Sequence, residues 1–120
     1  RASTVLNTSS IAGIKGIGSS VAYAASKGAL NTMTVSLARA LAPAIRVNAI
    51  CPGFIATRWF RDTMDEDAFA KTLERIETAT PLGVASGPDD IADAAMFFLS
   101  DASRHVTGEL LLVDAGLHLS

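Results

Sequence analysis

Three short apolar segments, separated by longer stretches of helix-forming sequence, constrain the fold of this 120-residue chain more than any other feature. They are STVLNTS at 3–9, IRVNAIC at 45–51 and ELLLVD at 109–114. Short apolar strands are typical of a parallel sheet that is covered on both faces. Strands that alternate with helices also favour a parallel sheet with helices packed against it. We therefore expect an α/β fold with a three-stranded parallel sheet.

Three stretches between these segments are expected to be helical. The first spans 20–41 and ends before Pro43, because a proline disfavours helical geometry in the residue that precedes it. The second spans 64–78 and begins with acidic residues, which the helix dipole favours. The third begins at a proline and spans about 88–99, which makes the element order β-α-β-α-α-β. The apolar residues at helical spacing in the first helix are Val21, Ala25, Leu30, Met33, Leu37 and Leu41.

The composition indicates a globular chain and excludes several classes of function. Hydrophobic residues make up 49% of the chain and charged residues 18%, which is too apolar for a disordered segment. The net charge of −2 is not the basic footprint of a nucleic-acid or membrane-surface protein. No segment approaches the roughly 18 continuous apolar residues of a membrane-spanning helix, and the N-terminus does not resemble a signal peptide. We expect a cytoplasmic protein with neither nucleic acid nor membrane as a partner.

The residue types that bind metals do not form a predicted metal site. Cys51 is the single cysteine, so no intrachain disulfide can form, and its apolar neighbours predict a buried and unreactive thiol. His105 and His118 have no partners at metal-ligand spacing, and we expect surface or packing roles for both. No metal is therefore predicted.

Polar and glycine residues follow each predicted strand. They lie at 7–10, 52–57 and 114–116. Right-handed crossovers bring the carboxyl ends of parallel strands to one edge of the sheet. Ligands of open α/β sheets bind at that edge. We therefore expect a binding site where these three segments meet.

Tyr23 and Lys27 are the first candidates for chemistry. They are four residues apart on a predicted helix, so they share a face and can approach each other. A free tyrosine has a pKa near 10, and a neighbouring ammonium stabilises the phenolate. Such a pair can exchange a proton with an alcohol or carbonyl oxygen. The same spacing also occurs by chance, so an ordinary helical pair is the alternative.

Two further features surround this pair. Small residues flank it, at Ala24, Ala25, Gly28 and Ala29, and they allow close approach either of a ligand or of another helix. Ser10 lies thirteen residues before Tyr23, after the first strand. Its hydroxyl could hold the same substrate oxygen, or it could simply cap a turn.

Four motifs together carry a resemblance to a known family. They are NTSSIAG at 7–13, YAASK at 23–27, IRVNAICPGFIAT at 45–57 and PDDIADAAMFFLSDASRHVTGELLLVDAG at 88–116. In this order and spacing they resemble the second half of a short-chain dehydrogenase/reductase, over essentially the whole chain. Among the members, 3-oxoacyl-thioester (acyl-carrier-protein) reductases are most similar, followed by sugar, polyol and steroid dehydrogenases. The resemblance implies the C-terminal part of a Rossmann-type doubly wound parallel sheet.

The resemblance also implies an activity and a set of site residues. The family uses NAD or NADP to interconvert carbonyls and secondary alcohols. Tyr23 matches the general acid/base, and Lys27 the ammonium that stabilises its phenolate and binds the nicotinamide ribose. Ser10 is similar in position to the serine that, with Tyr23, binds the substrate oxygen. The residues that the resemblance assigns to the cofactor are Thr8, Tyr23, Lys27, Pro52, Gly53, Ile55 and Thr57.

Residues 58–79 match the part of the family that forms a substrate loop and a helix closing over the site. Mixed apolar and charged residues suit a mobile lid. The alternative is that Phe69, Leu73 and Ile76 only pack the helix against the rest of the protein.

The family's first half has no counterpart in these 120 residues. It contains a glycine-rich turn for the cofactor pyrophosphate and an asparagine of the proton relay. GIKGIG at 13–18 does not replace that turn, and we interpret it as a substrate-side loop. Residues 1–120 are thus expected to be a partial NAD(P)-binding domain, inactive by itself, and the choice between NAD and NADP stays open. Ala115 also stands where the family often has glycine.

The resemblance implies a homodimer or homotetramer for the whole protein. Two alternatives to an enzyme stay open. One is a member that binds the cofactor without catalysis, and the other is a fragment that serves as an assembly partner. Assembly surfaces are expected around Ala29, Met33 and Leu37 and in the C-terminal segment at 110–119.

Overall fold

The structure is a computed structural model that describes residues 3–120. Three parallel strands form one sheet in the order β1-β2-β3. Their bounds are Ser3–Thr8 for β1, Ile45–Pro52 for β2 and Leu110–Val113 for β3. Strand β2 pairs with both of the others and is therefore the central strand. The predicted α/β fold and its parallel sheet are confirmed.

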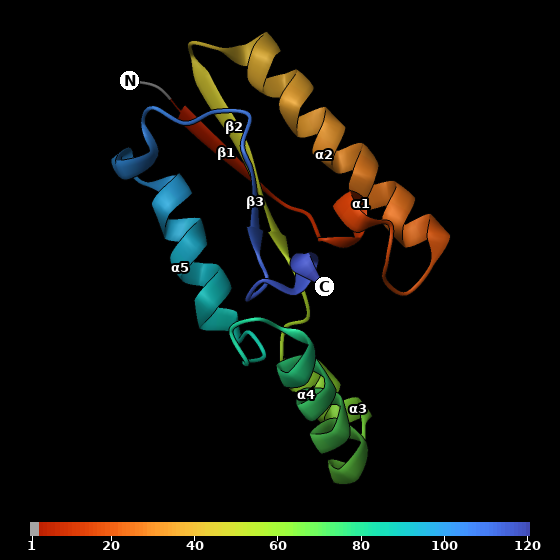
Figure 1. Cartoon of the computed structure of the whole chain (residues 1–120). Coiled ribbons are helices and arrows are strands. Elements are labelled where there is room, and N and C mark those ends of the chain that lie inside the picture. Colours follow the sequence, from red (N-terminus) through yellow and green to blue (C-terminus); the bar gives the residue numbers. More distant parts are fainter. Residues whose placement is uncertain (1–2) are drawn as a thin grey trace.

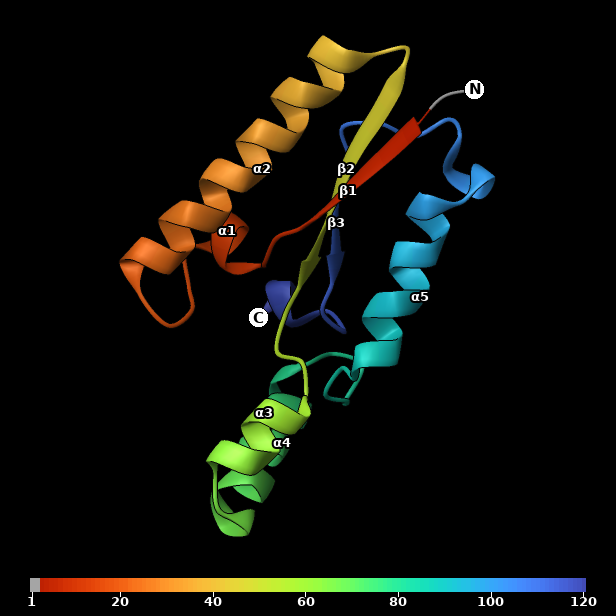
Figure 2. The ribbon, with the colours of Figure 1, turned by 180° about the vertical axis from the view of Figure 1, so that it is seen from behind.

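Helices cover both faces of this sheet. The short α1 and the long α2 lie on one face, and α5 lies on the other (Figures 1 and 2). The pair α3 and α4 projects beyond the carboxyl ends of the strands, which makes the molecule elongated, at 50 × 29 × 26 Å. The helices are α1 Ala12–Lys15, α2 Val21–Leu41, α3 Arg58–Thr63, α4 Glu66–Ala79 and α5 Pro88–Leu99, with 3-10 turns at Asp101–Ser103 and Leu117–Leu119.

The predicted elements are present to within two residues at each end, but two short helices were not predicted. The stretch 13–18 was expected to be a loop, and its first three residues belong to α1. Gly16 ends that helix with a φ of 70°, and its N–H donates to the Ala12 carbonyl. Helix α3 is six residues long. Helices this short show too few turns for a periodic pattern to be detected.

Strand β2 also extends one residue further than expected, through Pro52. A proline has no N–H for the sheet, so a central strand normally avoids it. Here the Pro52 carbonyl accepts a hydrogen bond from the Ile11 N–H at 3.0 Å, and the strand ends directly afterwards. The residue without an N–H donor is therefore the last one of the strand, where it interrupts no further hydrogen bonds of the sheet.

The core lies around β2, and the side chains that α2 buries against it are not the apolar ones at helical spacing. Buried apolar side chains come from β2 and from Ile11, Ala12, Ala38 and Phe98. Helix α2 buries Asn31, Thr34 and Ala38, whereas Val21 is 89% and Met33 48% exposed. Because the buried side chains are small, the helix can lie close to the sheet. The apolar spacing correctly predicted a helix, but most of those residues do not face the core.

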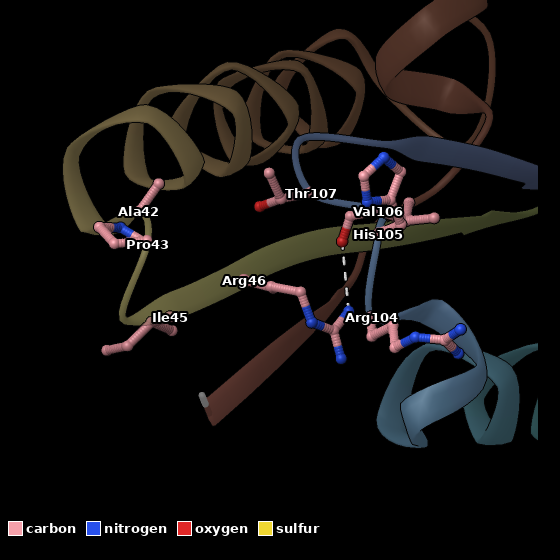
Figure 3. Close-up of a pocket in the computed structure, with 8 residues that line it drawn as sticks. All are labelled: Ala42, Pro43, Ile45, Arg46, Arg104, His105, Val106 and Thr107. Carbon is pink, nitrogen blue, oxygen red and sulfur yellow. Dashed lines mark hydrogen bonds between the residues drawn. The ribbon is translucent and has the colours of Figure 1, made fainter. Parts of the chain in front are cut away.

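Two polar side chains of β2 hold the loop that precedes β3. Arg46 Nη1 donates to the carbonyls of Ser103 and Val106, at 2.7 and 3.2 Å, and the second bond is drawn in Figure 3. Asn48 is fully buried, and it donates to the Val106 carbonyl and accepts from the Glu109 N–H. These bonds replace sheet pairing where β3 has not yet begun.

We expect Asn48→Ala to destabilise the protein by about 1 to 3 kcal/mol, because it leaves the Glu109 N–H without its partner and removes one of the two side-chain hydrogen bonds to the Val106 carbonyl. Urea unfolding of the whole protein, followed by circular dichroism, measures this change. Glu109→Ala is the matched control, since Glu109 takes part in these hydrogen bonds through its backbone N–H and carbonyl and its side chain is exposed. Its effect should stay within about 0.5 kcal/mol. Equal unfolding midpoints for the two variants would contradict the proposed anchoring.

Two further findings concern the described part of the chain. Among residues 3–120, no helix is long and apolar enough to cross a bilayer. The same residues contain no group of three or more histidine, cysteine, aspartate or glutamate side chains placed to hold a metal ion.

Candidate active site

The carboxyl end of β1 and the first turns of α2 form the centre of the candidate site. Ser20 directly precedes α2 as its N-cap, and its Oγ accepts from the Tyr23 N–H at 3.0 Å. This cap satisfies one free N–H at the start of the helix. It sets Tyr23 in the first turn and Lys27 one turn later. Ser9 and Ser10 lie at the other side, directly after β1.

Lys27 joins the helix to the end of β1. Its Nζ donates to the Thr8 carbonyl at 3.2 Å, and it lies 5.8 Å from the centroid of the Tyr23 ring. The Ser9 hydroxyl donates to the Lys27 carbonyl at 3.3 Å. The predicted proximity of Tyr23 and Lys27 is therefore present, and the ammonium is held between the tyrosine and the strand.

Close packing of glycines brings α1 against α2. A Cβ added to Gly13 would lie 2.5 Å from the backbone carbon of Lys27, so no side chain fits there. At Gly28 an added Cβ would meet only the Gly13 carbonyl, at 3.5 Å. The close approach of the two helices therefore requires glycine at Gly13, whereas Gly28 lies opposite it in ordinary contact.

Ser10 and Tyr23 line the same pocket, whose volume is about 350 Å³. Tyr23 is 39% exposed, so its ring is accessible from this side. The loop through Gly18 passes over the ring, and an added Cβ there would approach the Tyr23 Cδ2 to 3.5 Å. The other residues that line the pocket are Ile11, Ala12, Ile17, Gly18, Ser19, Gly53, Phe54 and Phe60.

The segment predicted to hold the nicotinamide begins beside this pocket. The Pro52 carbonyl accepts a hydrogen bond from the N–H of Ile11, which follows β1. Gly53 lines the pocket. A Cβ at Gly53 would come within 2.9 Å of the Asp114 Cβ, so glycine is required where β2 passes the end of β3. Ile55 and Thr57 lie further along.

The chain between Ile55 and α3 leaves the sheet. Ile55 bridges to Ser86, and the neighbouring Ala56 N–H donates to the Ser86 carbonyl at 2.8 Å. Thr57 precedes α3 without a side-chain cap. The structure thus gathers Thr8, Pro52 and Gly53 at the strand ends, and it sets Thr57 at the base of the projecting helices.

The predicted lid, residues 58–79, reaches the pocket through one described side chain. Phe60 of α3 packs against Phe54 with ring centroids 4.9 Å apart. Arg61 lies over the Phe69 ring at 5.4 Å and joins α3 to α4. Phe69, Leu73 and Ile76 are half-buried, as the packing interpretation expects. The residues of α4 do not line the pocket.

His118 has a partner that the sequence analysis missed. Its Nδ1 lies 2.9 Å from a carboxylate oxygen of Asp114, which is 5% exposed. Asp114 also accepts from the N–H groups of Gly116 and His118. The sequence feature that could have predicted this pair is an aspartate four residues before a histidine, with a glycine between them. In the turn between them Ala115 has a φ of 57°, a conformation that favours the glycine common in the family.

Cys51 behaves as predicted. Its side chain is fully buried. Burial raises the pKa of the Cys51 thiol, against weaker opposing hydrogen bonds from Ser9 and Ser10. The thiol is therefore protonated and unreactive near neutral pH.

Comparisons with known proteins indicate the family to which the chain is similar. A family model described as enoyl-(acyl carrier protein) reductase matches residues 1–118. The crystal structure of a short chain dehydrogenase family protein from Francisella tularensis superposes with a TM-score of 0.87 at 34% identity, covering 98% of this chain and 51% of that one. The chain belongs to the short-chain dehydrogenase/reductase family. Its structural neighbours have the Rossmann fold that the resemblance implied.

Two curated members of the short-chain dehydrogenase/reductase family show how far the likeness extends. A 3-oxoacyl-[acyl-carrier-protein] reductase from Thermotoga maritima is 40% identical over 98% of this chain and 46% of its own length. The inactive 2-(S)-hydroxypropyl-CoM dehydrogenase 2 of Xanthobacter autotrophicus is 39% identical over 98% of this chain and 52% of its own length. The chain therefore spans about half the length of these relatives.

Proposed function

We propose that the whole protein is an NAD(P)-dependent oxidoreductase that interconverts a carbonyl and a secondary alcohol by hydride transfer. The observation that carries this proposal is that Ser10 and Tyr23 line one pocket while the Lys27 ammonium lies beside the tyrosine ring. Membership of the short-chain dehydrogenase/reductase family supports the same reaction.

The residues present fit a nicotinamide cofactor at the carboxyl edge of the sheet. Thr8 is exposed there, Lys27 Nζ lies against the Thr8 carbonyl, and Gly53 lines the adjacent pocket. Thr8, Tyr23, Lys27 and the segment 52–57, through Pro52, Gly53, Ile55 and Thr57, would hold its nicotinamide half. When bound, the dinucleotide supplies or accepts the hydride.

The chain's own residues manage the substrate oxygen and its proton. The Ser10 and Tyr23 hydroxyls donate hydrogen bonds to the carbonyl oxygen, which orients the substrate and stabilises the charge that develops on it. Tyr23 Oη then gives its proton to the alkoxide, and the Lys27 ammonium stabilises the resulting phenolate. Oxidation of an alcohol runs the same steps in reverse.

Absorbance at the NAD(P)H band tests this function. The whole protein is mixed with NADH or NADPH and a panel of ketones, and in the reverse direction with NAD⁺ or NADP⁺ and secondary alcohols. We expect a ketone-dependent loss of reduced cofactor with at least one of the two nucleotides. Tight cofactor binding with no turnover of any substrate would contradict the proposal.

That outcome would favour the second candidate, a member that binds the cofactor without catalysis. The relative that is named inactive favours this second candidate. Its identity to the chain is 39%, nearly the same as the 40% of the 3-oxoacyl-[acyl-carrier-protein] reductase. The presence of Ser10, Tyr23 and Lys27 in one place argues for the enzyme.

We also propose that the whole protein is a homodimer or homotetramer. Ala29 and Met33 of α2 are exposed and four residues apart, so they share a helix face, and Leu119 near the C-terminus is 72% exposed. Exposed apolar residues on one element often mark an interface. Light scattering after gel filtration would give the mass directly.

A further inference from the structure

The pocket beside Ser10 and Tyr23 has a wall of apolar side chains. Phe54 follows β2, and Phe60 comes from α3, and their tilted rings are 4.9 Å apart. Ile17, from the glycine-rich loop, lines the pocket and is 46% exposed. Three separate segments thus contribute large apolar groups to one cavity, a convergence that the spacing of the sequence does not reveal.

The polar groups of this pocket are few and neutral. Among the described residues that line it, none is aspartate, glutamate, lysine, arginine or histidine. Its polar side chains are Ser10, Ser19 and Tyr23. Cationic and histidine side chains line a different pocket at the opposite edge of the sheet, where Arg46, Arg104 and His105 lie (Figure 3).

This lining discriminates between substrates of different polarity. A charged group or a row of hydroxyls would lose its water in the pocket without finding matching partners, which is costly. An apolar group gains from the same transfer. The pocket volume of about 350 Å³ gives room for roughly a dozen non-hydrogen atoms, at about 30 Å³ for each water-sized atom.

We propose that this pocket selects an uncharged, apolar substituent next to the reacting carbon, so that the substrate is an apolar ketone or secondary alcohol. Ser10 and Tyr23 face the oxygen, and Ile17, Phe54 and Phe60 contact the apolar group. The inference rests on the proposed function, because it assigns the substrate class of that same site.

Matched ketones test the inference with the whole protein and its preferred cofactor. The apolar probes are 2-octanone and acetophenone, and the polar probes are dihydroxyacetone and 4-oxopentanoate. We expect kcat/KM for the apolar probes to exceed that for the polar probes by at least about 30-fold. Binding of the same four compounds is measured by calorimetry in the presence of cofactor, which needs no turnover.

Variants of the wall assign the selectivity to its residues. Phe54→Ala and Phe60→Ala should each raise KM for 2-octanone about tenfold with little change for dihydroxyacetone. Phe97→Ala, an aromatic truncation on α5 outside this pocket, is the matched control and should leave both values unchanged. Ile17→Arg should raise kcat/KM for 4-oxopentanoate about twofold to fivefold, because it places a cation at the exposed rim.

The outcomes separate this inference from the proposed function. Turnover with equal or better use of the polar probes would overturn the substrate class and leave the reaction standing. Preferential binding of the apolar probes without any turnover would overturn the reaction and support the pocket's selectivity. Preferential binding of the polar probes without turnover would overturn both.

Discussion

Tyr23→Phe is expected to lower kcat for ketone reduction by about 10²- to 10⁴-fold, the range that a positioned proton donor contributes. The variant keeps the ring that lies against Gly18 and beside Lys27, and it keeps the backbone N–H that Ser20 caps. It removes only the hydroxyl that would protonate the alkoxide. Affinity for NAD(P)H should therefore change by no more than a few fold. Stopped-flow absorbance for turnover and fluorescence titration for cofactor binding measure the two effects separately.

The matched control is Ser36→Ala, which removes an exposed hydroxyl from the same helix. It should leave both kcat and cofactor affinity unchanged. Near-normal turnover by Tyr23→Phe would show that another group supplies the proton. A loss of cofactor affinity as large as the loss of kcat would instead assign Tyr23 to binding.

Gly13→Ala is expected to destabilise the protein by about 1 to 3 kcal/mol, the usual cost of forcing atoms into a filled space. The new methyl group would fall 2.5 Å from the Lys27 backbone carbon and 2.7 Å from the Gly28 nitrogen. These are backbone atoms in the middle of a 21-residue helix, so no side-chain rotation relieves the clash. Moving α2 away would also loosen the bond from Lys27 to Thr8. We therefore expect lower thermal stability together with lower activity.

Gly28→Ala is the matched control, because Gly28 lies on α2 opposite Gly13 of α1. There the added methyl group meets only the Gly13 carbonyl, at 3.5 Å, which is ordinary van der Waals contact. Inside a helix, alanine is also more favourable than glycine by about 0.5 to 1 kcal/mol. We expect this variant to be as stable as the parent or slightly more stable in a thermal melt. If both alanine variants melted at the parent's temperature, the close approach of α1 and α2 would not exist in solution.

Local patterns were sufficient to predict the strands and the long helices. The apolar segments at 3–9, 45–51 and 109–114 predicted three parallel strands because short apolar runs between helices have few other folds available. The same patterns did not predict which face of α2 is buried. Asn31 and Thr34 face the core because their small side chains let the helix lie close to β2. Helical spacing alone does not predict that small polar side chains are buried in place of larger apolar ones.

The candidate site divides in the same way. Tyr23 and Lys27 share a helix face by virtue of their spacing, so the sequence was enough to bring them together. Ser10 was a candidate from its position after the first strand, with turn capping as the alternative, and the resemblance to a family favoured the site. The structure places it in the same pocket as Tyr23. The partnership of Asp114 and His118 was missed because it forms across a turn rather than along a helix.

The sequence by itself determined the order of the elements, the helical pair of Tyr23 and Lys27, and the chemistry that those side chains can perform. These depend on residues close together in the chain, where the geometry of a helix or strand is known in advance. Only the tertiary structure decided that Gly13 must be glycine, and that Phe54, Phe60 and Ile17 form one apolar wall beside Ser10. Those contacts join segments far apart in the chain, and their distances follow from the packing of α1, α2 and α3 around the end of the sheet.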